Sequence, residues 1–261
     1  MYVDSHCHLH LIDYSALGID MDAVVAQAQT AGVEHLLCVA THPEQQEELF
    51  NIGQRYKNVS ISFGLHPNDA IAVEPTAEDY LAVIASAEQL GVRLVAIGET
   101  GLDYFRTTEG LDAQRDRFRT QIQVAKAAVK PLIIHTRAAK EDTVRILREE
   151  GARDVGGVIH CFTEDWDYAK QVLDLDFHVS FSGIVTFKQA HELQLVAQQL
   201  PLERMLIETD SPYLAPVPLR GKINQPAYVI HVAKYIADLR NISVQEFALS
   251  TTSNYHRLFG M

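Results

Sequence analysis

The chain has 261 residues, of which 47% are hydrophobic and 21% are charged. This composition is typical of a globular protein and excludes the disordered and fibrous classes. The 34 acidic residues outnumber the 22 lysines and arginines, which gives a formal net charge of −12. Because an acidic surface repels nucleic acid and anionic membranes, a phosphate-bearing substrate would have to be held by local cationic groups.

Cysteines and apolar runs indicate the cell compartment. The three cysteines, Cys7, Cys38 and Cys161, are too scattered for a disulfide framework, and no Cys-x-x-Cys pair could clamp a structural zinc ion. The first residues show no leader pattern, and no apolar run approaches the length of a membrane span. We therefore expect a cytoplasmic protein that does not enter a membrane, and no obligate protein partner is evident.

Short β-branched or apolar runs alternate along the chain with longer segments of helical periodicity, which predicts a repeating strand–helix pattern. The eight predicted strands are residues 2–3, 35–39, 59–63, 94–97, 132–134, 157–159, 178–181 and 205–207. Helices are expected over residues 21–31 and 112–129, where apolar residues recur at helical spacing.

Two predicted capping boxes mark helix starts. Thr76 is followed three residues later by Asp79, and Ser243 is followed three residues later by Glu246. The second box opens a helix in a C-terminal region that already carries an apolar stripe around residues 229–239. No linker, low-complexity tract or internal repeat is found, so we expect a single domain over residues 1–261.

Eight apolar strands separated by helices fit either a closed barrel or a doubly wound open sheet, and periodicity does not choose between them. The polar residues do favour one of the two. A histidine or an acidic residue follows many of the strands, as at the C-terminal rim of a barrel, and no Gly-rich phosphate loop follows the first strand. The predicted fold class is α/β, a single (β/α)8 barrel (TIM barrel) with extra C-terminal helices.

The pattern His6-x-His8 ends the first predicted strand. The two-residue period of a strand points both imidazoles to one side, where two nitrogen donors make a clamp for a metal ion. Taken alone, such a pair is as often a set of ordinary hydrogen-bonded histidines. The rest of the chain supplies the context that favours the metal.

Four further ligand-type residues follow other predicted strands: Glu99, His135, His160 and Asp210. If the strands close into a barrel, these side chains and the two histidines converge on one rim. Burying so many titratable groups without metal or mutual hydrogen bonds would cost several kcal/mol. The set predicts two divalent ions, and it suits Zn, Mg, Mn or Ni with little discrimination.

The chain resembles the TatD-related metal-dependent hydrolases and deoxyribonucleases of the amidohydrolase superfamily over essentially its whole length. The resemblance rests on specific motifs in order: Asp4-Ser5-His6-Cys7-His8, Gly64-Leu65-His66-Pro67, Gly98-Glu99-Thr100-Gly101-Leu102-Asp103, Pro131-Leu132-Ile133-Ile134-His135, His160-Cys161-Phe162, Glu208-Thr209-Asp210-Ser211-Pro212-Tyr213-Leu214, and Arg220-Gly221 with Asn224. It implies a distorted barrel whose two-metal centre is held by His6, His8, Glu99, His135, His160 and Asp210.

The chain departs from the family pattern at two places. Thr100 stands where an aliphatic residue is usual, which changes packing behind the site. The sequence Thr163-Glu164-Asp165 replaces a small turn and adds negative charge near the rim. That charge would weaken polyanion binding or narrow the range of substrates.

Roles in catalysis and substrate binding follow from residue type. Glu99 is the candidate for bridging two ions, and Asp210 for ligating one ion, accepting the proton of the attacking water, or both. His66, Arg137 and Arg220 are the candidates for contacting substrate phosphate, although each type also occurs in ordinary turns and surface ion pairs.

The predicted function is that of a metal-dependent hydrolase that cleaves the phosphodiester bonds of DNA. The acidic surface and a sunken site predict action at single-stranded or frayed ends, and the resemblance implies 3′-to-5′ exonuclease polarity. The alternatives on the same barrel are an amide or lactone hydrolase and a hydrolase of small phosphate esters. No lysine ends a predicted strand, which disfavours the amide or lactone hydrolase. No Asp-x-His pair follows the last strand, which disfavours the hydrolase of small phosphate esters. A catalytically silent binding scaffold would have no need of the six ligands.

Overall fold

The computed structural model describes residues 1–261, and its eight strands belong to one sheet in which they follow one another in chain order. The strands are β1 (Tyr2–Cys7), β2 (Val33–Cys38), β3 (Val59–Phe63), β4 (Leu94–Asp103), β5 (Leu132–Arg137), β6 (Gly157–Ile159), β7 (Phe177–Phe181) and β8 (Met205–Ile207). The pairings run parallel. Parallel strands in chain order with intervening helices define the (β/α)8 barrel, and the predicted fold class is confirmed.

Ten α-helices accompany the strands: α1 (Tyr14–Leu17), α2 (Met21–Thr30), α3 (Gln46–Arg55), α4 (Ala77–Gln89), α5 (Leu111–Ala128), α6 (Lys140–Glu149), α7 (Trp166–Leu173), α8 (His191–Gln199), α9 (Val229–Arg240) and α10 (Val244–Phe259). The two predicted helices, 21–31 and 112–129, are confirmed to within one residue at each end as α2 and α5. No helix combines the length and the hydropathy that crossing a bilayer requires.

The chain divides into two compact units, each assembled from separate segments. The first unit comprises Met1–Cys38, Cys161–Ala169 and Val179–Met261, and the second comprises Val39–His160 and Lys170–His178. The first therefore holds β1, β2 and β8 with the C-terminal helices, and the second holds β3 to β6. The single domain over residues 1–261 stays a prediction.

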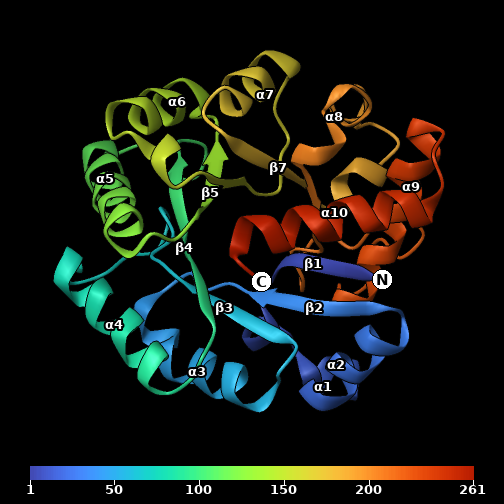
Figure 1. Ribbon diagram of the computed structural model, residues 1–261, viewed down its shortest axis with the longest axis horizontal. Helices are drawn as coiled ribbons and strands as arrows, with labels where there is room; N and C mark the ends of the chain where they lie inside the picture. Colours follow the sequence, from blue (N-terminus) through green and yellow to red (C-terminus); the bar gives the residue numbers. More distant parts are fainter. The chain divides into compact units, whose positions relative to one another are not determined.

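In the first unit, β1 pairs with β2 on one side and contacts β8 on the other. Past the end of β8, Ser211 forms an isolated parallel bridge to Cys7. Helix α10 lies beside β1 (Figure 1). Both α9 and α10 contact β1 and β8, and α10 buries Phe247 and Tyr255. The predicted extra C-terminal helices are thus present, and they support the strand that carries His6.

In the second unit, β4 and β5 extend beyond their apolar cores. Strand β4 was expected to end at residue 97 and β5 at residue 134, but the two remain paired as far as Asp103 opposite Arg137. The polar end of β4 pairs with the polar end of β5, and the sequence pattern of either strand alone does not reveal this pairing. Glu99 and His135 consequently lie within two strands that pair with each other.

Gly98 permits the approach of β4 to β5 just before Glu99. Its φ is +141°, a backbone conformation that favours glycine, and a Cβ atom there would lie 2.5 Å from the carbonyl oxygen of Ile133. Helix α5 covers β4 with Phe118 and Ile122, which are fully buried. The Glu99 backbone is therefore held between a neighbouring strand and a packed helix.

Candidate metal centre

Two imidazoles and one carboxylate meet in the first unit. His6 Nε2 lies 3.2 Å from His8 Nε2. Asp210 Oδ1 lies 3.7 Å from His6 Nε2 and 3.4 Å from His8 Nε2. All three side chains are largely buried, with 14% of the Asp210 side chain exposed. Nitrogen and oxygen donors that face one spot are the arrangement that a divalent cation requires.

The loop after β8 brings Asp210 to this cluster. Asp210 has a φ of +56°, a left-handed conformation that costs a side-chain-bearing residue about 1 kcal/mol. Hydrogen bonds hold it there, since Asp210 N donates to His6 O (2.9 Å) and His8 N donates to Ser211 O (2.8 Å). Asn224 Nδ2 donates to two carbonyl groups of the same loop. The loop is thereby fastened to the strand that carries both histidines.

Asp4 makes a second connection between β1 and this loop. Its carboxylate is fully buried and accepts from Thr209 N (2.8 Å) and Thr209 Oγ1 (2.5 Å). Burial raises the pKa of Asp4 to about 8, although these hydrogen bonds act in the opposite direction. Asp4 appeared in the sequence motif without a role, and only its position two residues before His6 pointed to one.

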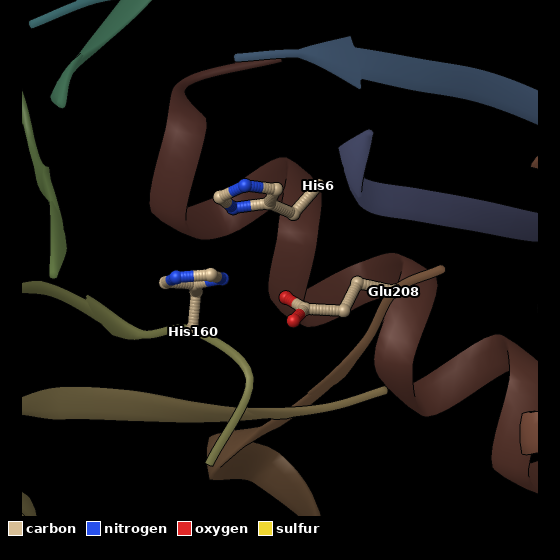
Figure 2. Close-up of side chains that lie close together, drawn as sticks. All are labelled: His6, His160 and Glu208. Atoms are coloured by element: carbon tan, nitrogen blue, oxygen red, sulfur yellow. The ribbon is translucent and has the colours of Figure 1, made fainter. Parts of the chain in front are cut away.

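Glu208 differs from Asp210 in its surroundings. A strand continuing to residue 210 would point both carboxylates the same way, but β8 ends at Ile207. Glu208 Oε1 accepts from Cys161 N (2.7 Å), and a carboxylate oxygen lies within 4.8 Å of the His6 imidazole donor (Figure 2). Glu208 therefore lies beside His6. Cys161 has a φ of +44° and is half-buried.

The second unit gathers three imidazoles around Glu99. Its Oε1 atom lies 2.8 Å from His160 Nε2, 3.2 Å from His135 Nδ1 and 3.4 Å from His66 Nε2. His160, also drawn in Figure 2, directly follows β6. The donor atoms of His66, Glu99 and His135 all lie within 4.8 Å of one another. This cluster is a second set of donors with metal-ligand chemistry.

Charge and burial act against each other at Glu99. Burial would raise the pKa of this carboxyl, but the imidazoles of His160 and His66, with hydrogen bonds from His135 and His160, hold it well below its usual range. Burial is also the main reason that the pKa of His66 falls to about 4, despite the nearby Glu99 charge. At neutral pH the site therefore contains an ionised Glu99 and a neutral His66.

His135 is clamped between two carboxylates. Its Nδ1 faces Glu99, and its Nε2 lies 3.2 Å from Asp103 Oδ2. Burial would lower the pKa of His135, but the two carboxylates raise it above its usual value. Asn68 Nδ2 donates to the same Asp103 oxygen at 2.7 Å. Neither Asp103 nor Asn68 was singled out from sequence. Asp103 ends the motif that contains Glu99, and Asn68 directly follows the motif that contains His66.

The three predicted phosphate contacts have different settings. Arg137 and Arg220 are exposed, and each guanidinium lies over an aromatic ring, with Arg137 above Phe105 and Arg220 above Phe187. His66 belongs to the Glu99 cluster. Neither arginine forms an ion pair, whereas the largely buried His66 faces the Glu99 carboxylate. All three remain candidates for binding an anion.

The six predicted ligands thus fall into two sets. His6, His8 and Asp210 come together in the first unit, and Glu99, His135 and His160 come together in the second. A single centre made from all six, with Glu99 as a bridge, stays a prediction. The donors are imidazole nitrogens and carboxylate oxygens, a chemistry that fits divalent transition ions and magnesium.

Comparison with known proteins adds an independent finding. A family model described as "TatD related DNase" matches residues 3–260. The chain is 49% identical over 260 residues to the metal-dependent hydrolase YcfH of Escherichia coli (strain K12), covering 98% of this chain and 95% of that protein. It is 33% identical over 266 residues to the mouse protein named "Putative deoxyribonuclease TATDN3", covering 98% and 87%.

A solved structure agrees over the whole chain. The crystal structure of YJJV, a TatD homologue from Escherichia coli K12, superposes with a TM-score of 0.88 at 26% identity. The match covers 100% of this chain and 98% of that one. Sequence and fold therefore point to the same group of proteins.

Proposed function

The chain belongs to the family of TatD-related DNases and is a metal-dependent hydrolase; on this premise we propose that it hydrolyses phosphodiester bonds in DNA with the help of two divalent ions. The observation that carries the proposal is the pair of clusters, in which imidazoles converge on Asp210 in one unit and on Glu99 in the other. The name of the mouse relative supports a DNA substrate.

Each cluster would hold one ion. His6, His8 and Asp210 supply two nitrogens and an oxygen for the first, and Glu99, His135 and His160 supply the same set for the second. Bound divalent ions lower the pKa of a water molecule towards neutrality and neutralise charge on a phosphoryl oxygen. The donor set leaves the choice among Zn, Mn, Mg and Ni open.

The chain's own side chains account for proton and phosphate handling. Asp210 retains 14% side-chain exposure, so its carboxylate can accept the proton of an attacking water. Neutral His66 can donate a hydrogen bond to a phosphate oxygen, and Arg137 and Arg220 can bind neighbouring phosphates through their guanidinium forks. Glu99 keeps its charge and orients the three imidazoles around it.

We further propose that the enzyme removes nucleotides from the 3′ end of single-stranded or frayed DNA. With a net charge of −12 we expect no basic stripe that would grip a duplex along its length. A paired strand would have to open before its phosphate reached buried carboxylates and imidazoles. An end is where opening costs least.

The first test is metal content combined with a substrate panel. Purified protein should contain divalent metal and should hydrolyse single-stranded DNA in preference to amides, lactones and small phosphate esters. His6→Ala and His8→Ala should lower the metal content without unfolding the protein, whereas His191→Ala, at an exposed histidine that begins α8, should not. Full metal content in both cluster variants, or a preference for an amide or a small ester, would refute the proposal.

End specificity is tested with DNA that has no end. Closed circular single-stranded DNA should persist, and the same molecule after linearisation should be degraded. A 3′-terminal blocking group should protect the linear form, and a 5′-terminal group should not. Rapid cleavage of the circle would show that the enzyme is an endonuclease. Protection of the linear form by the 5′-terminal group alone would show that degradation proceeds from the 5′ end.

A further inference from the structure

Two adjacent aromatic residues after β4 have different environments. Tyr104 is half-buried, its hydroxyl donates to Asp142 Oδ2 (2.6 Å), and it accepts from Arg115 Nε (2.9 Å). The next residue, Phe105, is 64% exposed. Tyr104 therefore anchors the loop to the body of the second unit, whereas the Phe105 ring adds little to the core.

The exposed ring has one cationic neighbour. The Arg137 guanidinium carbon lies 3.9 Å from the centre of the Phe105 ring, within the range of a cation–π contact. The backbone fixes this neighbourhood, because Tyr104 N donates to Arg137 O at 2.9 Å and Asp103 is the register partner of Arg137. The ring is thus held in place while most of its surface stays open to solvent.

Asp103 connects this ring to the Glu99 cluster. Its Oδ1 accepts from Phe105 N (3.0 Å) and Arg106 N (2.9 Å), and its Oδ2 faces His135 Nε2. One buried carboxylate therefore orients both the loop that presents Phe105 and the imidazole of a proposed metal ligand. The loop that presents Phe105 is therefore fixed to the same carboxylate that His135 faces.

We propose that Phe105 and Arg137 form a nucleotide subsite, in which an unpaired base stacks on the Phe105 ring and the Arg137 guanidinium binds a phosphate of the same strand. This inference rests on the proposed function and specifies how the substrate is held. Aromatic stacking accepts every base, and a base inside a duplex has no free face to offer. The subsite would thus select single strands without selecting a sequence.

Kinetics on matched oligonucleotides test the subsite. The metal-loaded enzyme is given a single-stranded oligonucleotide and the same oligonucleotide with abasic 3′-terminal positions. We expect kcat/KM to be about 5- to 150-fold higher for the base-bearing form, as stacking of one base is worth about 1–3 kcal/mol. Phe105→Ala should bring this ratio close to one, and Phe105→Trp should preserve it.

Phe105→Leu is the matched control for bulk. Leucine keeps an apolar side chain of similar size but has no aromatic face, so it should behave like alanine. Arg137→Gln should lower kcat/KM for both oligonucleotides, because both carry the phosphate. An unchanged ratio in Phe105→Ala, or a wild-type ratio in Phe105→Leu, would show that the ring and guanidinium are only a structural pair.

Binding separates this inference from the proposed function. Metal-loaded protein is titrated with fluorescent phosphorothioate oligonucleotides, which resist hydrolysis, in base-bearing and abasic forms. Tighter binding of the base-bearing form that is lost in Phe105→Ala supports the subsite even if the wild-type protein cleaves no DNA. Cleavage of DNA without any Phe105-dependent preference in binding or kinetics would overturn the subsite and leave the proposed function standing.

Discussion

Glu99 and Asp210 are the two carboxylates on which imidazoles converge, and each can be replaced by an amide of the same shape. Glu99→Gln and Asp210→Asn should lower kcat by about 10²–10⁴-fold with a smaller change in KM, because each removes charge needed for metal binding or proton acceptance. Steady-state kinetics on single-stranded DNA measure this. Glu44→Gln, at a side chain that is 89% exposed, is the control and should leave kcat unchanged. An unchanged kcat in Glu99→Gln or Asp210→Asn would exclude that residue from the mechanism.

Asp103 is a positioning residue, and its replacement should act through His135. Asp103→Asn removes the charge that faces His135 Nε2 and weakens the acceptor for the Phe105 and Arg106 amides. Loss of such an outer partner typically lowers metal affinity by about 10- to 100-fold. Competition with a chelator measures this affinity. Asp154→Asn, on a largely exposed side chain, should leave it unchanged.

Thr100 carries a hydroxyl group that is buried without a hydrogen-bond partner. An unsatisfied buried polar group costs about 1–3 kcal/mol, so the isosteric change Thr100→Val should raise the free energy of unfolding by about 1 kcal/mol. The matched control is Thr143→Val. That hydroxyl bonds Thr136 Oγ1 (3.0 Å) and Ala139 O (2.9 Å), so its removal should destabilise the protein. Urea denaturation of both variants measures the difference, and a destabilised Thr100→Val would contradict the expectation.

The residue types of the site could be predicted from sequence, but their partners could not. His6, Glu99, His135 and Asp210 are conspicuous because each follows an apolar run. The turn that brings Asp210 to His6 and His8 depends on a left-handed φ and on Asn224, which lies 14 residues further along the chain. Asp103 acts on an imidazole 32 residues away. Contacts of that kind arise from tertiary structure and leave no local pattern.

Helix ends and strand cores were readable from the chain because their causes are local. The capping box at Thr76 is present in full, with Asp79 N donating to Thr76 Oγ1 and Thr76 N donating to Asp79 Oδ2. At Ser243 half of the predicted box forms, since Ser243 Oγ accepts from Glu246 N at the start of α10. By contrast, the polar ends of β4 and β5 are strands only because each pairs with the other. A capping box can be predicted from one segment of the sequence, whereas strand pairing depends on two segments that are far apart in the chain.

The Thr76 box makes the stability of α4 testable by mutation and pH. Thr76→Ala should lower the free energy of unfolding by about 1 kcal/mol at neutral pH. Hydrogen bonds from Thr76 hold the pKa of Asp79 below its usual value. The contribution of these bonds is therefore present above the unfolded pKa of Asp79 and is lost as pH falls through the lower, folded value. Urea denaturation of the wild type and Thr76→Ala at pH 7 and pH 3 measures this contribution. The loss of stability caused by Thr76→Ala should be smaller at pH 3, and a larger loss at pH 3 would contradict the prediction.

At the scale of the whole molecule, charge decides how a polyanion can be bound. The chain has a net charge of −12 and presents only Arg137 and Arg220 as exposed candidate phosphate contacts. Each neutralised phosphate of a single strand contributes a slope of about −0.7 to the dependence of log affinity on log salt. Two contacts give about −1.4. With this net charge we expect no long-range attraction to DNA, so recognition of a DNA substrate would have to come from the site itself.

Salt dependence therefore measures how many phosphates the enzyme holds. With two contacts, affinity for a non-cleavable single-stranded oligonucleotide should fall only about 7-fold between roughly 50 and 200 mM salt. Arg137→Gln and Arg220→Gln should each flatten the slope by about 0.7, because each removes one cation that displaces counterions. Lys222→Gln removes a nearby charge of the same sign that has no assigned contact, and it should leave the slope unchanged. A fall of about 10³-fold or more would require a far larger basic surface than these two arginines provide, and it would show that the substrate runs along the protein instead of entering by its end.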